Sequence, residues 1–340
     1  PTFIYLMKVN ALAVNQPNEK LKPFTYELDE LGSEDIDVKV LYCGICHSDM
    51  SMMNNEWGLT QYPIVPGHEI VGEVLGVGSS VKNIKVGDNV GIGWLSSSCM
   101  SCSECMSGDH NLCASGEGTI IGRHGGFSEY VRSHWSWAIP IPDGMDLSKT
   151  GPLLCGGITV FSPMYLSNIK PTDSVGVIGI GGLGHLAIKF LKHWGCEVIA
   201  FSSNSSKEAE ILEMGASKVI NSKDSKQLEM VSGKLKFILN TTNVSLDWNS
   251  YLSALSPKGK LHTVGAVLEP MEIPAFSLIM GDKSVGGSPI GSPELIRLML
   301  EFCKRHNIYP DVEEFPMNMA NEAVEHLKEG KARYRVVLKA

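Results

Sequence analysis

The sequence predicts an α/β protein of two domains, one built on a doubly wound parallel sheet and the other on a small β-barrel. The first prediction rests on residues 174–194, where a short β-branched run is followed by glycines and an amphipathic helix. The second rests on residues 62–93, where Val and Ile runs are separated by single glycines. Beyond residue 173, strand-like and helix-like segments alternate, as in sheets with crossover helices.

Four glycines follow the first strand of the parallel sheet in a G-x-G-G-x-G pattern. In this strand–turn–helix context the pattern predicts a dinucleotide site. Gly179 permits the tight turn, Gly181 lets a pyrophosphate approach the backbone, and Gly184 lets the helix pack closely on the strand. Gly182 and Leu183 complete the turn into the helix, whose free N–H groups attract phosphate. The alternative is a glycine-rich turn that binds nothing.

Short apolar runs bounded by turn residues predict the other strands. The parallel strands are expected at 174–180, 197–202, 218–220, 236–240, 260–265 and 284–287, with helices at 207–214 and 293–306. The N-terminal residues 1–42 read as antiparallel β structure that starts with a first strand, and the final residues 332–340 as a strand that rejoins the first domain. The predicted domains are therefore 1–159 with 291–340, and 160–290.

Length and charge narrow the function class. A chain of 340 residues is long enough for two domains, and a net charge of −8 argues against nucleic acid and against an anionic membrane surface. No apolar run approaches the ~20 residues that span a bilayer. The start lacks a charged region and a small-residue cleavage site, so we expect a cytoplasmic protein.

Four of the nine cysteines form a C-x2-C-x2-C-x7-C array. The surrounding residues include Ser, Gly, Asn and Asp and offer almost nothing to make a core, so four thiolates so close together predict one structural zinc ion. An iron–sulfur cluster is the competing interpretation, and a redox-sensing zinc site is a third. Cys43, Cys196 and Cys303 are interpreted as small packing residues. The array consists of Cys99, Cys102, Cys105 and Cys113.

Several motifs together resemble the zinc-dependent medium-chain alcohol dehydrogenases, most of all the cinnamyl-alcohol-dehydrogenase-like branch. The motifs are GICHSD at 44–49, PGHEIVGEV at 66–74, the cysteine array, CGGITVFSP at 155–163, GIGGLGHLA at 179–187 and YRVVL at 334–338. The resemblance implies a GroES-like barrel as the catalytic domain and a Rossmann domain for the nucleotide. It also implies a catalytic zinc on Cys46, His68 and Cys155, hence two zinc ions per chain. Two Cys and one His with an open fourth position suit a catalytic zinc.

The resemblance also implies roles around this metal. Asp49 would orient the ligating His68, and Glu69 would assist ligand exchange beside the zinc. Ser48 would contact the substrate oxygen and pass its proton. The family often has a His three residues beyond this hydroxyl, where this chain has Ser51. His47, Thr159 and Arg335 are placed near the cofactor, with Thr159 also near the zinc.

The cofactor preference is predicted from the end of the second parallel strand. A ribose-binding acid belongs there in NAD proteins, but this chain has Ser202 and Ser203, followed by Lys207. Hydroxyls and a cation suit a 2′-phosphate, which predicts NADP(H).

The predicted function is a zinc- and NADP(H)-dependent alcohol dehydrogenase acting mainly as an aldehyde reductase on aromatic or medium-chain substrates. Trp57, Trp94 and Ile290 are the candidate apolar pocket. The alternatives are a polyol or secondary-alcohol dehydrogenase on the same scaffold, and a non-catalytic, crystallin-like nucleotide-binding protein. Family likeness indicates a homodimer.

Overall fold

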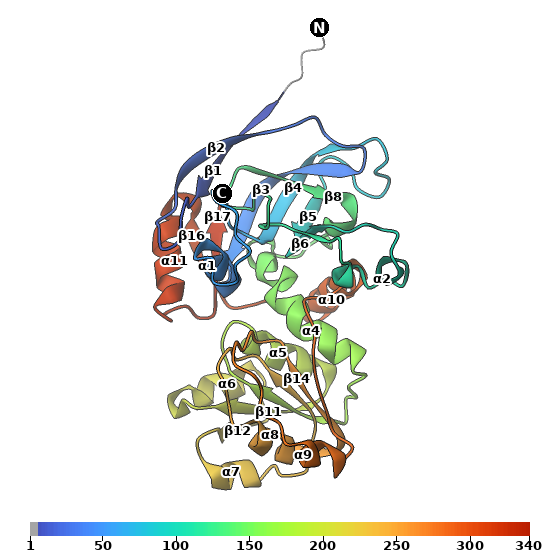
Figure 1. The fold of residues 1–340 in the computed structure, drawn as a ribbon, viewed down its shortest axis with the longest axis vertical. Coiled ribbons are helices and arrows are strands. Elements are labelled where there is room, and N and C mark those ends of the chain that lie inside the picture. The colour runs from blue at the N-terminus through green and yellow to red at the C-terminus, as the bar shows by residue number, and fades with distance from the viewer. Residues whose placement is uncertain (1–5) are drawn as a thin grey trace. The chain divides into compact units, whose positions relative to one another are not determined.

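The computed structural model describes residues 6–340, so the first residues of the predicted N-terminal strand lie outside the described part. The chain divides into two compact units, coloured by residue number in Figure 1. One contains the residues up to Cys155 together with Gly291–Ala340, and the other contains Gly156–Ile290. The boundary thus falls at 155/156, where the sequence prediction has 159/160. No helix within residues 6–340 is long and apolar enough to cross a membrane.

The unit Gly156–Ile290 is built on a six-stranded parallel sheet in the order β12-β11-β10-β13-β14-β15. This order reverses between β10 and β13, so the prediction of a doubly wound sheet is confirmed. The predicted strand limits agree with the observed ones to within a few residues, except that β14 begins five residues earlier. The strands are β10 (Ser174–Ile178), β11 (Glu197–Ser202), β12 (Lys218–Asn221), β13 (Leu235–Asn240), β14 (Leu255–Thr263) and β15 (Ser284–Gly287).

Helices connect these strands, and the one after the glycine turn is the most regular. In α5 (Gly184–Trp194) the apolar residues at helical spacing are buried, and Gly195 ends the helix in the left-handed conformation with φ of 106°. The remaining helices are α4 (Gly156–Leu166), α6 (Glu208–Met214), α7 (Ser225–Glu229), α8 (Trp248–Ala254), α9 (Ala275–Ile279) and the 3₁₀ turn η4 (Ser205–Lys207).

The other unit contains a seven-stranded sheet in the order β16-β17-β3-β4-β5-β9, with β8 also paired to β3. All of its pairings are antiparallel except that of β16 with β17. Two two-stranded antiparallel sheets, β1-β2 and β6-β7, accompany it. The strands are β1 (Met7–Ala13), β2 (Lys22–Leu28), β3 (Asp35–Ile45), β4 (Glu69–Val77), β5 (Asn89–Ile92), β6 (Leu95–Ser97), β7 (Glu117–Gly118), β8 (Tyr130–His134), β9 (Ile139–Pro140), β16 (Val312–Pro316) and β17 (Arg335–Lys339).

Short helices complete this unit, and the longest, α10, starts and ends at the predicted residues. Its start has a Ser292 cap that accepts a hydrogen bond from Leu295 N–H, and Asn307 ends it in the left-handed conformation. The helices are α1 (His47–Met53), α2 (Ser103–Met106), α3 (Leu147–Thr150), α10 (Pro293–His306), α11 (Ala320–Lys328) and the 3₁₀ turns η1 (His110–Leu112), η2 (Trp135–Trp137), η3 (Gly151–Leu154) and η5 (Met317–Met319).

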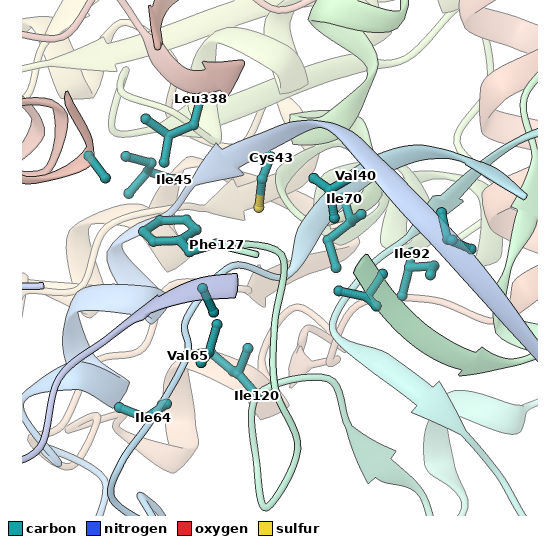
Figure 2. Close-up of a cluster of buried hydrophobic side chains, with 14 of the residues drawn as sticks. Val40, Cys43, Ile45, Ile64, Val65, Ile70, Ile92, Ile120, Phe127 and Leu338 are labelled. Atoms are coloured by element: carbon teal, nitrogen blue, oxygen red, sulfur yellow. The ribbon is translucent and has the colours of Figure 1, made fainter. Parts of the chain in front are cut away.

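The core of this unit lies against β3 and β4 (Figure 2). Cys43 is fully buried there, near Ile70 and Phe127, and burial raises the pKa of its thiol well above the usual value. Cys196 and Cys303 are also buried. All three thiols therefore lie at packing positions, as predicted.

Candidate active site

Three residues far apart in sequence converge beside β4. Cys46 precedes α1, His68 precedes β4, and Cys155 follows η3. His68 Nε2 lies 3.2 Å from Cys155 Sγ, and one ligand atom from each residue and from Glu69 lies within 4.8 Å of all the others. His68, Glu69 and Cys155 are buried, whereas Cys46 is partly exposed. The predicted ligands of the catalytic zinc therefore share one site.

Asp49 holds this cluster in place from the first turn of α1. One of its carboxylate oxygens accepts hydrogen bonds from His68 Nδ1 at 2.8 Å and from Gly67 N–H at 2.9 Å. The other accepts from Cys46 N–H at 2.9 Å. Because the Nδ1 proton of His68 is directed at a carboxylate, the Nε2 lone pair faces the two sulfur atoms.

The electrostatics of the cluster favour a cation. Burial alone would lower the pKa of His68, but Asp49 and the Cys46 thiolate outweigh it and raise that pKa well above its usual value. A hydrogen bond from Cys155 lowers the pKa of the Cys46 thiol well below its usual range. The raised pKa of His68 indicates a negative potential around its ring, and the lowered pKa of Cys46 favours the thiolate form that a metal ligand requires.

Glu69 is paired with Arg335, the first residue of β17, in a fully buried ion pair. Burial raises the pKa of Glu69 to about 7, and the Arg335 guanidinium acts in the opposite direction. The second oxygen of Glu69 has no hydrogen-bond partner among residues 6–340. Glu69 also offers one carboxylate oxygen to the metal-ligand cluster. The structure therefore places Arg335, predicted near the cofactor, against the carboxylate beside the ligands.

Two tryptophans lie next to the cluster. The Trp94 ring, between β5 and β6, meets the His68 ring edge-on with centroids 4.9 Å apart. Trp57, after α1, packs against Trp94 at 6.0 Å. Both rings are partly exposed. They form an apolar surface beside the cluster, where the sequence places a substrate pocket.

The four-cysteine array forms a second cluster on a surface lobe around α2. The four sulfur atoms lie within 4.8 Å of one another. Backbone N–H groups point at the sulfurs, including Cys99 N–H to Cys113 Sγ at 3.4 Å and Cys105 N–H to Cys102 Sγ at 3.5 Å. The N–H groups of Ser101 and Cys102 lower the pKa of Cys99 to about 6. These bonds stabilise thiolates.

The glycine turn of the other unit fits a phosphate-binding role. Gly179 has φ of 84°, and a Cβ on Gly184 would lie 1.9 Å from the Gly179 carbonyl oxygen, so both positions require glycine. A Cβ on Gly181 would meet nothing within 4 Å. The protein itself therefore leaves room above Gly181, where the sequence predicts a pyrophosphate.

A cavity of about 590 Å³ opens at the carboxyl end of the parallel sheet. Its wall includes Gly179, Ser202, Ser203 and Lys207, all predicted cofactor contacts. The Asn204 amide oxygen accepts a hydrogen bond from Ser206 N–H, so a neutral residue caps the turn where β11 ends. Ligands of open α/β sheets bind at this position.

The structure also gives the positions of the other predicted site residues. His47 and Ser48 form the start of α1, with His47 exposed and Ser48 partly buried. Thr159 is buried in α4, and Ile290 is the last residue of the unit Gly156–Ile290. Ser51, where the family often has a His, donates its hydroxyl to Glu56 at 2.7 Å.

Comparison with known proteins identifies the family. Residues 32–143 match the alcohol dehydrogenase GroES-like domain, and residues 182–305 match the zinc-binding dehydrogenase domain. An aldehyde reductase, AdhA, from Synechocystis sp. is 52% identical over 97% of this chain and 98% of its own. The chain belongs to the zinc-dependent medium-chain alcohol dehydrogenases, in their cinnamyl-alcohol-dehydrogenase-like branch.

Solved structures of this branch agree over almost the whole length. A cinnamyl alcohol dehydrogenase from Sorghum bicolor matches with a TM-score of 0.93 and 36% identity, covering 98% of both chains. One from Helicobacter pylori, complexed with NADP(H), matches with a TM-score of 0.90 and 32% identity, covering 98% of this chain and 99% of that one. The predicted family and fold class, including the GroES-like domain, are confirmed.

Both clusters of this alcohol dehydrogenase fit zinc by their donor sets. Ligand atoms around a tetrahedral zinc are separated by about 3.5–4 Å, and the separations here lie within 4.8 Å. The array offers four thiolates and closes its coordination sphere. The buried cluster offers two thiolates and one imidazole, with one Glu69 carboxylate oxygen beside them. Its fourth position is therefore available to a small ligand or to that carboxylate.

Two features were not predicted from the sequence. The Glu69–Arg335 pair joins residues 266 positions apart, and no local pattern connects them. The cavity wall also includes Ser222, Lys223 and Tyr251. The first two follow β12, so the rule that ligands bind at the carboxyl ends of parallel strands could have identified them.

Proposed function

We propose that this chain is a zinc- and NADP(H)-dependent alcohol dehydrogenase that acts mainly as an aldehyde reductase on aromatic or medium-chain aldehydes. The observation that carries the proposal is the convergence of Cys46, His68 and Cys155 into one buried cluster. When bound, zinc supplies a Lewis acid that polarises a carbonyl, and the reduced nicotinamide supplies a hydride. The chain's own residues hold the metal, orient its ligands and protonate the reduced carbonyl oxygen.

The protein sets the charge at the reacting centre. Two thiolates balance a divalent cation, which leaves a mild Lewis acid suited to reversible exchange between alcohol and carbonyl. Asp49 fixes the His68 tautomer through the 2.8 Å bond to Nδ1. Arg335 pairs with Glu69, so the Glu69 carboxylate stays in the cluster without adding a full uncompensated charge.

Ser48 is the proposed proton donor to the reduced carbonyl oxygen. It lies two residues after Cys46 on the first turn of α1, whose start is fixed by the bonds to Asp49. The Trp57 and Trp94 rings exclude water beside the cluster and offer flat apolar surface to the substrate. Such a surface favours an aromatic or alkyl aldehyde over a polyol.

The test is a steady-state screen of NADPH oxidation with benzaldehyde, cinnamaldehyde and hexanal, run beside NADP⁺ reduction with sorbitol and mannitol. We expect turnover with the aldehydes at kcat/KM values at least about tenfold above those for the polyols. Turnover with the polyols alone would replace the proposal by the polyol dehydrogenase. A protein that binds NADPH but turns over none of these substrates would favour the non-catalytic alternative.

The preference for NADP(H) is proposed from the cavity at the end of β11. Ser203 and Lys207 line it, and no carboxylate stands at the end of this strand to repel a 2′-phosphate. Replacing Ser203 by Asp should therefore shift the ratio of kcat/KM for NADPH over NADH by at least about tenfold toward NADH, through charge repulsion. An unchanged ratio would contradict the assignment, and Ser206→Asp, outside the cavity wall, is the control.

We further propose a homodimer in a reducing compartment such as the cytoplasm. Strand β15 ends the order of the parallel sheet, and Phe276, Ile279 and Met280 in and after α9 are more than two-thirds exposed. Exposed apolar side chains of this kind are typical of an interface. The nine cysteines, all of which lie within residues 6–340, form no disulfide. Light scattering should give about twice the 36.9 kDa mass of one chain, and a monomer would contradict the dimer.

A further inference from the structure

The cavity at the carboxyl end of the sheet has a second polar wall, on the loop after β12. Ser222 and Lys223 line it together with the predicted residues on the loop after β11. The two strands are parallel neighbours with Ser202 paired to Asn221, and Ser222 N–H donates to the Ser202 carbonyl oxygen at 3.2 Å. The two loops therefore start side by side and face the same space.

Side-chain hydrogen bonds fix the backbone of this second loop. Lys223 N–H donates to the Asn221 amide oxygen at 3.0 Å, and Asn221 N–H donates to Gln227 Oε1 at 2.8 Å. Asp224 accepts from the N–H groups of Lys226 and Gln227 and from the Gln227 side-chain amide. The position of Lys223 on the wall is thus set by the fold, while its exposed side chain is free to reach a ligand.

The charges on the wall favour an anion. Among the lining residues, Lys207 and Lys223 are basic and Asp247 is acidic. Asp247 is committed to the start of α8, because its carboxylate accepts from Ser250 N–H at 3.4 Å and from Ser250 Oγ at 2.5 Å. Asp224 does not line the cavity, and its oxygens are used at the start of α7. Two lysines therefore face a space whose one lining carboxylate is already engaged.

We propose that Lys223 is a second cation of the 2′-phosphate subsite and, together with Lys207, determines the preference for NADP(H). This rests on the proposed function and deepens its cofactor preference. A 2′-phosphate carries a charge of about −2 at neutral pH, so one lysine does not balance it. Ser222 adds a hydroxyl on the same wall. No residue of this loop belongs to the reacting centre.

The test measures binding of 2′,5′-ADP and 5′-AMP to the full chain by calorimetry, because these probes differ only in the 2′-phosphate. In Lys223→Gln we expect the Kd for 2′,5′-ADP to rise about three- to tenfold and the Kd for 5′-AMP to stay unchanged. The slope of log Kd against log salt should become shallower, since one charge is lost. Lys223→Arg should keep the preference for 2′,5′-ADP. Lys226→Gln, on the same turn but outside the cavity wall, is the matched control and should change neither Kd.

The outcomes separate this inference from the proposed function. If the wild-type chain prefers 2′,5′-ADP and Lys223→Gln keeps the same ratio, the role of Lys223 is contradicted while the NADP(H) preference stands. Equal weakening of both probes in Lys223→Gln would also contradict it, because that pattern indicates a damaged loop. If the wild-type chain binds both probes equally, the proposed NADP(H) preference itself fails.

Discussion

The two cysteine clusters of this chain are built in opposite ways. The array from Cys99 to Cys113 is local in sequence, lies on a surface lobe, and has its sulfurs held by backbone N–H groups. The buried cluster joins Cys46, His68 and Cys155 from separate elements. Hydrogen bonds to the Asp49 carboxylate orient it. Four thiolates close one site, whereas the other keeps a position open.

This difference indicates that the two clusters have different roles, one in folding and the other in catalysis. A lobe with few apolar residues depends on its metal for order, so its site contributes mainly to folding. The buried cluster lies on a β-sheet core that packs without it, so its site is available for chemistry. Losing a ligand should therefore affect activity in one cluster and stability in the other.

The largest effect is expected from Cys155→Ala. Removal of this ligand should lower kcat/KM for aldehyde reduction by at least about 10³-fold, because the Lewis acid is lost or misplaced. The free energy of unfolding should fall by no more than about 2 kcal/mol, since the small buried site can collapse. Steady-state kinetics and urea unfolding measure the two. A variant that unfolds but keeps its specific activity would reverse the assigned roles.

The complementary change is Cys113→Ser in the lobe. Loss of one of four thiolates should lower stability by about 2–4 kcal/mol, because the lobe cannot order itself without the metal. Limited proteolysis should then cut between residues 95 and 122, which include β6 and β7 at the base of the lobe. The folded fraction should keep kcat within about tenfold of wild type. Loss of activity without loss of protease resistance would contradict these different roles.

A smaller effect is expected from the groups that surround the ligands. Asp49→Asn should lower zinc affinity or kcat by about 10–100-fold, because it weakens the bond that sets the His68 tautomer. Its matched control is Ser101→Ala in the lobe, which removes a hydroxyl 3.8 Å from Cys99 Sγ on an exposed surface. The control should change kcat by less than about twofold, and it should change the free energy of unfolding by less than about 0.5 kcal/mol. Equal effects at the two positions would remove the distinction between the clusters.

The same contrast explains how much could be predicted from the sequence. The lobe, the glycine turn and α10 depend on short-range patterns and caps, and their limits or members were predicted from spacing alone. The buried cluster was predicted only through the family resemblance, because His68 and Cys155 are 87 positions apart in the sequence. The Glu69–Arg335 pair escaped prediction because its partners meet only when β17 joins β3 near the start of β4.

The residues on the loop after β12 could be predicted only in part from the sequence. Their place beside β11 follows from the parallel strand order, but the sequence alone does not say which strand neighbours which. Ser202 and Lys207 could be predicted because they follow the glycine motif at a known distance. Lys223 required the register of the folded sheet.

If the chain holds two zinc ions of different function, the metal content of the purified protein, measured by mass spectrometry, should show both. We expect two zinc atoms per wild-type chain. We expect one in Cys155→Ala, which should stay folded and inactive, and one in Cys113→Ser, which should stay active where folded. Iron in place of zinc, or a wild-type chain that turns over aldehydes with the buried cluster empty, would contradict this expectation.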